Sequence, residues 1–377
     1  MEFDLSWILL GLPAAFGLGW AASRLDWRQL RIENRNAPKA YFRGLNFLLN
    51  EQQDQAIDAF IEAVQNDPDT SELHFALGNL FRRRGEYERA VRVHEHLLQR
   101  ADLAQADRHR AQHALALDFL KAGLLDRAES ALRKLNGTAF EGEAALALLA
   151  IYERSRDWPQ AADIALALER AGQGNFGARR AHYLCEQAAK ASIPEAISLL
   201  QQALEISGDS PRPSIELAQL LMRQGDATLA FATLAFAATQ VPAAMPLLAA
   251  PLTEAAIASH QTVEAQALLR SSYEQRPTLD VMDALVRLDQ STDTARDWYL
   301  RHLAMEPSLI AAARWIAGER LEHEQFHPQV QRALDHAVKP LNRYRCAACG
   351  FEANQHFWQC PGCQSWDSYP ARRVEEL

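Results

Sequence analysis

The sequence predicts an all-α repeat solenoid with an N-terminal transmembrane helix and a small C-terminal metal-binding ribbon. Three observations indicate this fold class: an uncharged apolar segment near the start, a helical pattern that recurs about every 34 residues, and two CxxC pairs near the end. The boundaries that follow are a membrane anchor over 1–23, a basic linker over 24–36, repeats over 37–310, terminal helices over 311–340 and a ribbon over 341–377.

The apolar segment "LSWILLGLPAAFGLGWAA" (Leu5–Ala22) has 18 residues and no charge. As a helix it spans about 27 Å, close to the thickness of the hydrocarbon core of a bilayer. Acidic residues precede it and basic residues follow it, whereas a cleaved signal peptide begins with basic residues. The positive-inside rule therefore predicts a single-pass inner-membrane protein with a periplasmic N-terminus and a cytoplasmic body. A signal peptide and a buried soluble helix are the alternatives.

The middle of the chain is a degenerate repeat array. "YFRGLNFLLNEQQDQAIDAFIEAVQNDP" and "HFALGNLFRRRGEYERAVRVHEHLLQRAD" superpose with an offset of 34 residues, which aligns Gly44 with Gly78 and Ala56 with Ala90. This is the tetratricopeptide pattern, in which small residues let two helices pack closely and each pair stacks on the next. The alanine of the second helix recurs at intervals of 30 to 38 residues, at Ala56, Ala90, Ala128, Ala161, Ala196, Ala230, Ala265 and Ala295. About eight repeats are expected.

A solenoid of this kind has a concave face lined by the first helix of each pair. In the second repeat this face is predicted to hold the partner-binding candidates Phe75, Asn79, Arg82 and Arg83. A groove of mixed polar and apolar character suits a protein segment better than a small substrate. The alternative is that Arg82 and Arg83 belong to an ordinary solvated surface.

Composition and motifs exclude several function classes. The net charge of -9 and the pI of about 5.8 do not suggest nucleic-acid binding. "HEQFH" (His323–His327) matches the H-E-x-x-H pattern of zinc proteases, but Pro328 directly after it disfavours helical geometry at His327. We interpret it as a polar link between helices. No phosphate loop and no nucleophile motif is present, so no catalytic residue is predicted and the chain is not expected to be an enzyme.

The last 37 residues hold four of the five cysteines. Cys346 and Cys349 form one CxxC pair, Cys360 and Cys363 form another, and ten residues separate the pairs. Four thiolates in a tetrahedral arrangement select zinc or iron, and a ribbon this small needs a metal to supplement its core. The favoured interpretation is one structural zinc ion, with an iron site and a redox dithiol as alternatives. The fifth cysteine, Cys185, is expected to be a buried apolar residue.

The order of these parts resembles the lipopolysaccharide assembly protein B family of Gram-negative bacteria over the whole chain. The likeness is carried by the Leu5–Ala22 segment with its basic flank, the repeats from Ala37, and "CAACGFEANQHFWQCPGCQSWDSYP". The "CPGCQSW" stretch alone is also similar to the ribbon of a DNA-repair ATPase, but no phosphate loop follows it here.

The resemblance implies a non-enzymatic regulator of lipopolysaccharide synthesis, with a rubredoxin-like ribbon that binds metal and packs against the repeats. Family members act as inner-membrane adaptors that bring the lipid A deacetylase LpxC to the membrane protease FtsH. A lipopolysaccharide-sensing inner-membrane protein restrains them, and other lipopolysaccharide-assembly proteins are further expected partners. The alternative function is a scaffold that gathers lipopolysaccharide-building enzymes without directing proteolysis. The oligomeric state, a dimer included, is left open.

Overall fold

A computed structural model describes residues 16–17, 19–20, 39–66, 70–289, 292–319 and 323–377. The predicted anchor lies almost entirely outside this range, and so does the basic linker. Among the described residues no single helix is long and apolar enough to span a membrane. One bent pair, Ala227–Gln240 with Pro242–Ser259 at 116°, meets the length and composition criteria jointly.

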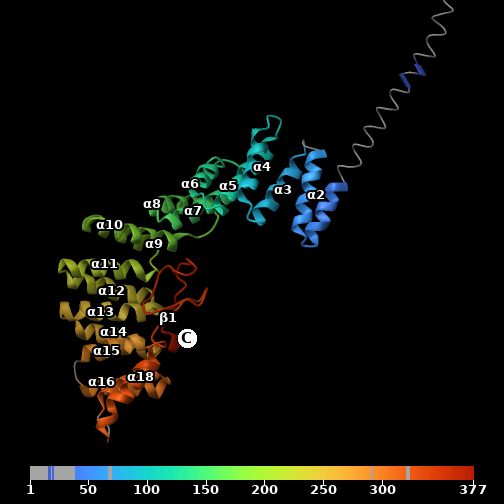
Figure 1. Cartoon of the computed structure of the whole chain (residues 1–377). Helices are drawn as coiled ribbons and strands as arrows, with labels where there is room; N and C mark the ends of the chain where they lie inside the picture. Colours follow the sequence, from blue (N-terminus) through green and yellow to red (C-terminus); the bar gives the residue numbers. More distant parts are fainter. Residues whose placement is uncertain (1–15, 18, 21–38, 67–69, 290–291, 320–322) are drawn as a thin grey trace, which may run out of the picture. The chain divides into compact units, whose positions relative to one another are not determined.

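The chain forms two compact units, Met1–Ile151 and Tyr152–Leu377. After a helix over residues 39–49, the first unit contains α2 (Gln53–Asn66), α3 (Ser71–Arg83), α4 (Tyr87–Gln99), α5 (Gln105–Lys121), α6 (Leu125–Arg133) and the start of α7 (Glu141–Ser155) (Figure 1). The second unit continues with α8 (Trp158–Arg170), α9 (Gly177–Ala188), α10 (Ile193–Ile206), α11 (Pro211–Gln224), α12 (Ala227–Gln240), η1 (Pro242–Ala244), α13 (Met245–Ser259), α14 (Thr262–Gln275), α15 (Leu279–Asp289) and α16 (Thr292–Met305).

The predicted repeat alanines fall where the pattern requires. The eight alanines lie in α2, α4, α6, α8, α10, α12, α14 and α16, which is the second helix of each successive pair. The first seven are at most 2% exposed, and Ala295 is half-buried. The all-helical tetratricopeptide solenoid is therefore confirmed over the described repeats.

The turn inside six of the eight pairs has a common signature. The residue five positions before the repeat alanine has a φ between 58° and 86° at Glu51, Gly85, Gly123, Arg156, Gly225 and His260. This left-handed conformation ends the first helix, and glycine adopts it without the steric cost of a Cβ. The register deduced from the alanines and the observed turns therefore agree.

Small residues bring the two helices of a pair together. A Cβ added at Gly78 would lie 2.5 Å from the ring of His94, and one added at Gly44 would lie 2.9 Å from Phe60. Both distances are too short for any side chain larger than glycine unless its neighbour moves. The aligned glycines are thus required by helix packing, as expected from the repeat pattern.

Beyond the repeats, α17 (Leu309–Gly318), η2 (Glu324–Phe326) and α18 (His327–Val338) lead to the ribbon, which contains β1 (Tyr344–Arg345), β2 (Glu352–Ala353) and η3 (Val374–Glu376). Strands β1 and β2 are antiparallel, with Tyr344 opposite Ala353. The histidines of "HEQFH" are not one turn apart on one helix, because His323 precedes η2 whereas His327 begins α18. His327 Nε2 lies 3.1 Å from the carbonyl oxygen of Ile316, as suits a link between helices.

Candidate metal centre and its contacts

The two CxxC segments form the same turn. In the first, the amide of Gly350 donates to Cys346 O and the amide of Cys346 donates to Phe351 O. In the second, Gln364 donates to Cys360 O and Cys360 donates to Ser365 O. Each turn thus folds its two cysteines back toward the same point.

The left-handed residue of each turn follows the second cysteine by one position. It is Gly350 (φ 78°) in the first turn and Gln364 (φ 61°) in the second. Gly362 lies beside Phe351, and a Cβ added there would be 3.4 Å from that side chain, an ordinary contact distance.

The four sulfurs are positioned to bind one metal ion. All four lie within 4.8 Å of one another, with 3.8 Å between Cys346 Sγ and Cys363 Sγ and 3.7 Å between Cys349 Sγ and Cys360 Sγ. A tetrahedral ion with metal–sulfur distances of about 2.3 Å separates its ligands by about 3.8 Å. Among the described residues no other histidine, cysteine or carboxylate group forms such a cluster.

The thiols themselves indicate that a cation belongs there. At Cys346, desolvation opposes ionisation, but hydrogen bonding with Ser368 and with the turn amides outweighs it and lowers the pKa to about 6. At Cys349 the Phe351 amide lowers the pKa, but desolvation and the three neighbouring sulfurs raise it to about 12. Four thiolates this close repel one another, and a divalent ion removes that repulsion.

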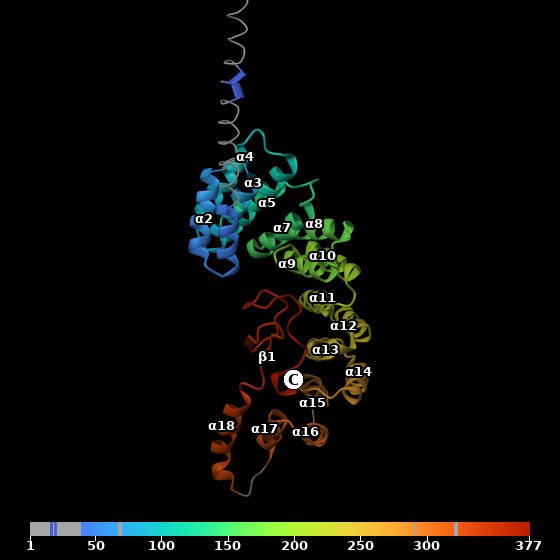
Figure 2. The ribbon, with the colours of Figure 1, turned by 90° about the vertical axis from the view of Figure 1, so that its right-hand side faces the viewer.

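The ribbon docks on the repeats of the second unit through Trp366. The ring of Trp366 stacks on His182 of α9, with 4.8 Å between centroids, and meets Trp158 and Tyr183 edge-on. Its indole Nε1 donates to Glu153 at 3.0 Å, and Glu153 also accepts a hydrogen bond from the hydroxyl of Tyr183. Both views place the ribbon beside α11 to α15 (Figures 1 and 2). The implied packing of ribbon against repeats is therefore observed.

A polar cluster lies next to this stack. The His182 ring is buried, and its Nε2 lies 2.8 Å from one Asp367 oxygen and 3.0 Å from the other. On the other side of the ring, Arg212 Nη1 is 3.5 Å from Nδ1. Arg212 is paired in turn with Glu186 and Glu216. Sequence patterns gave no signal for this cluster, because its members come from helices and ribbon far apart in the chain.

Two glutamates near the end of the chain cap α15 and α17. Glu375 accepts hydrogen bonds from the Leu309 amide (2.6 Å) and the Ser308 hydroxyl (2.7 Å) at the start of α17. Glu376 accepts from the Leu279 amide (2.7 Å) at the start of α15. Carboxylates stabilise helix N-termini by satisfying free amides and by their charge. An acidic terminal pair is a sequence signal, but nothing in the sequence identified which helices it caps.

The predicted partner-binding residues lie in the first unit. Phe75 is 2% exposed, with the guanidinium of Arg110 4.2 Å above its ring. Arg82 donates to Asp118 (2.9 Å) and to Asn79 (2.5 Å), whereas Arg83 is exposed. The structure thus assigns internal contacts to Phe75, Asn79 and Arg82. That these four residues bind a partner stays a prediction.

Two family models match the chain. Residues 344–369 match a rubredoxin metal-binding domain, and residues 73–109 match a tetratricopeptide repeat. The first match covers all four cysteines, and the second covers most of α3 and all of α4.

Curated relatives match over the full length. Lipopolysaccharide assembly protein B of Escherichia coli strain K12 is 29% identical over 388 aligned residues, which cover 99% of this chain and 100% of the relative. The protein of that name from Haemophilus influenzae is 28% identical, with 97% of each chain covered. Among solved structures, a tetratricopeptide repeat protein from Parabacteroides merdae has 14% identity and a TM-score of 0.34, covering 67% of this chain and 99% of that chain. The resemblance seen in the sequence is confirmed: the chain is a full-length homologue of proteins named lipopolysaccharide assembly protein B.

Proposed function

We propose that this homologue of lipopolysaccharide assembly protein B is a non-enzymatic adaptor that limits lipopolysaccharide synthesis. It is anchored in the inner membrane by residues 1–23 and has its repeats and ribbon in the cytoplasm. It brings the deacetylase LpxC to the protease FtsH, and a lipopolysaccharide-sensing membrane protein and other assembly proteins act on it. The observation that carries the proposal is the match to the named relatives along the whole chain, ribbon included.

The architecture suits an adaptor. A tether and two binding surfaces raise the effective concentration of substrate at a protease without any catalytic residue of their own. The metal centre has four protein ligands, which is the closed arrangement of a structural site rather than a catalytic one. We propose zinc as its ion, held by Cys346, Cys349, Cys360 and Cys363. The ion supplies the attraction that holds the two turns together.

The decisive measurement is the half-life of LpxC in a strain that lacks its own homologue and carries this chain. The adaptor shortens the half-life relative to the empty strain. A scaffold that only gathers enzymes leaves the half-life unchanged, and that result would reject the adaptor. A matched variant without residues 1–22 is expected to fold and bind metal but to leave LpxC stable, because the tether is lost.

Metal content tests the zinc assignment separately. Purified full-length protein is expected to be colourless and to contain one zinc ion per chain. A visible absorption band with stoichiometric iron would overturn the assignment without bearing on LpxC turnover.

A further inference from the structure

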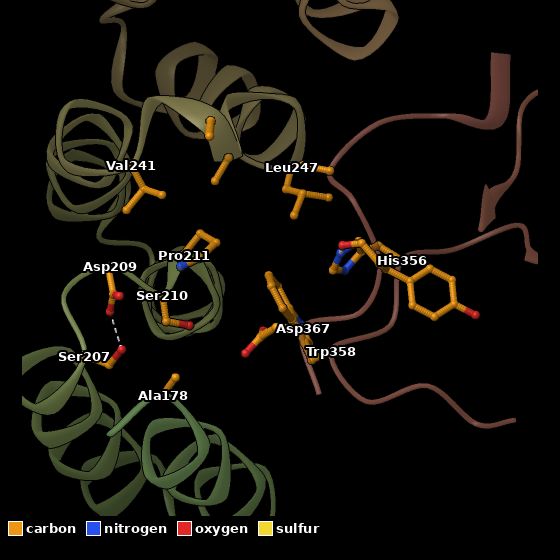
Figure 3. A pocket seen from close by; sticks show the side chains of 14 residues that line it. Ala178, Ser207, Asp209, Ser210, Pro211, Val241, Leu247, His356, Trp358 and Asp367 are labelled. Carbon is orange, nitrogen blue, oxygen red and sulfur yellow. Dashed lines mark hydrogen bonds between the residues drawn. The ribbon is translucent and has the colours of Figure 1, made fainter. Parts of the chain in front are cut away.

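A cavity of about 480 Å³ lies where the ribbon meets the repeats of the second unit. The repeat side comes from the start of α9, the loop between α10 and α11, and the η1–α13 corner. The ribbon side contains His356, Trp358, Asp367 and Tyr369. In Figure 3 the side chain of Trp358 reaches into the space bounded by Leu247, Pro211 and Ser210. The cavity exists because the ribbon is docked, and it is separate from the four cysteines.

One buried polar group in this cavity lacks a partner. Ser210 is 8% exposed, and its Oγ has no hydrogen-bond partner within the described part of the chain. Ser210 stands in the cap position of α11 but makes no side-chain cap, since Pro211 and Pro213 remove two of the first three helix amides. Its hydroxyl points toward Asp367 and Trp358 (Figure 3). A buried hydroxyl without a partner is unfavourable, and a bound polar group removes that penalty.

The cavity carries uncompensated negative charge. The guanidinium of Arg212 can only donate, so His182 Nδ1 accepts and the ring proton sits on Nε2, facing Asp367. The Nε2–H of His182 then donates to the Asp367 carboxylate, which supplies the negative charge of this part of the cavity. The Asp367 side chain is 50% exposed and can meet a second partner.

Other nearby groups do not neutralise the negative charge of the Asp367 carboxylate. Arg212 is already shared between Glu186 and Glu216. Asp209 adds a further carboxylate to the lining, held by a 2.5 Å hydrogen bond from Ser207. None of the fourteen lining residues is lysine or arginine. Burial lowers the pKa of His356, so it adds no positive charge at neutral pH.

We propose that this cavity is a binding site for an arginine side chain presented by a peptide segment of a partner protein. The planar guanidinium suits a carboxylate such as Asp367, leaves an N–H for the hydroxyl of Ser210, and packs against an aromatic ring such as Trp358. Leu247, Val241 and Pro211 cover the aliphatic stem. The site rests on the cavity alone and does not depend on the proposed adaptor role.

The test uses full-length protein in detergent with its metal bound and with 5-fluorotryptophan in place of tryptophan. The fluorine resonance of Trp358 is assigned by its loss in Trp358→Phe. The probe is a blocked Ala-Arg-Ala peptide, and its uncharged isostere has citrulline in the centre. The arginine peptide is expected to shift the Trp358 resonance in a saturable manner in the millimolar range, as a single side chain allows. The citrulline peptide is expected to bind at least about tenfold more weakly.

Substitutions in the cavity test which residues bind the arginine peptide. Asp367→Asn removes a charge without changing the shape of the side chain, and it is expected to weaken binding about tenfold or more. Ser210→Ala is expected to weaken it about two- to tenfold. Glu264→Gln, on the exposed surface of α14, is the matched control and leaves binding unchanged. Circular dichroism and metal content verify that each variant is folded.

Three results would overturn the proposal: no saturable shift with the arginine peptide, equal binding of the citrulline peptide, or full binding by both Asp367→Asn and Ser210→Ala. Agmatine, a free alkyl guanidinium, tests whether the ligand is an arginine within a peptide or a small guanidinium compound. Weaker binding of agmatine than of the peptide supports a peptide ligand, whereas tighter binding would replace it with a small cation.

Discussion

Each unit of the molecule contains a buried histidine next to an aspartate, and the two pairs differ in what they connect. In the first unit, His94 Nδ1 lies 2.5 Å from Asp118, both side chains are fully buried, and Arg82 completes the network. In the second unit, buried His182 meets Asp367, which is half exposed. The first pair joins α4 to α5, and the second joins α9 to the ribbon.

The two pairs therefore depend on different parts of the fold. The His94 pair connects neighbouring helices, so it forms with the repeats themselves. The His182 pair joins residues 185 positions apart and exists only when the ribbon is folded and docked. A change at the metal should therefore reach the second pair and spare the first.

The largest effect is expected from Cys360→Ser. It removes a buried cysteine of the proposed zinc site, and a structural zinc ion contributes about 10 kcal/mol or more to the folding of a small domain. Metal content falls, and amide hydrogen exchange rises through 344–369 and at the start of α9. Exchange in α3 to α5 stays at the wild-type level. Faster exchange in α4 and α5 would mean that the two pairs are coupled and would break the comparison.

Asp118→Ala is expected to have the next largest effect, confined to the first unit. It leaves His94 and Arg82 without their buried acceptor, which costs about 3–5 kcal/mol. Hydrogen exchange in α3 to α5 reports the loss, and metal content stays unchanged. Glu88→Ala, with a side chain that is 93% exposed, is the control and shifts stability by about 0.5 kcal/mol or less. Equal effects of the two variants would show that the buried network contributes little.

The repeats could be predicted from sequence because their contacts are periodic. Ala56, Ala90 and Gly78 are required by packing within one pair or between neighbours, so spacing alone reveals them. The four cysteines of the metal centre could also be recognised from the sequence, because two short turns of fixed geometry present them. In both cases the partners are near one another in sequence.

The docking contacts could not be predicted, because they join the ribbon to helices far from it in the chain. No sequence pattern connects Trp366 to Glu153 or His182. The caps that Glu375 and Glu376 make on α17 and α15 are of the same kind. The contact of Arg110 with the ring of Phe75 is likewise one that the repeat pattern did not indicate.

Asp367→Ala is the counterpart of Asp118→Ala, because it removes the carboxylate from the His182 pair. The carboxylate is half exposed and water can replace it at His182, so the expected cost is about 1 kcal/mol. Hydrogen exchange should rise at the start of α9 and in the residues flanking Trp366, while α3 to α5 stay unchanged. A cost as large as that of Asp118→Ala would contradict the distinction between the two pairs.

His302 tests how a buried histidine behaves without an aspartate partner. Burial lowers its pKa below the ordinary 6.5, and its Nδ1 lies 2.8 Å from the Tyr273 hydroxyl. The unfolded chain therefore takes up a proton before the native chain does as the pH falls. Its contribution to stability is complete above about pH 6.5 and declines as the pH falls from there toward the native pKa.

The pH effect is measured as the melting temperature between pH 7 and pH 5 for wild type and His302→Gln. Glutamine keeps a hydrogen-bond acceptor for Tyr273 but does not titrate, so the variant should lose less stability on acidification than wild type. Parallel curves for the two proteins would show that His302 takes no part in the acid sensitivity.

The smallest predicted effect concerns the left-handed turn inside a helix pair, a type of turn that occurs in both units. His260 and Gly225 occupy equivalent positions with φ of 58° and 86°, but His260 bears a Cβ that disfavours this conformation. His260→Gly should therefore raise the free energy of unfolding by about 0.5–1 kcal/mol, less any added freedom of the unfolded chain. Gly225→Ala is the reciprocal change and should lower it by a similar amount, because alanine gains the same strain. Hydrogen exchange in α13 and α14 reports the first change and exchange in α11 and α12 the second. If both variants lowered stability, the conformation of the turn would not be what selects glycine there.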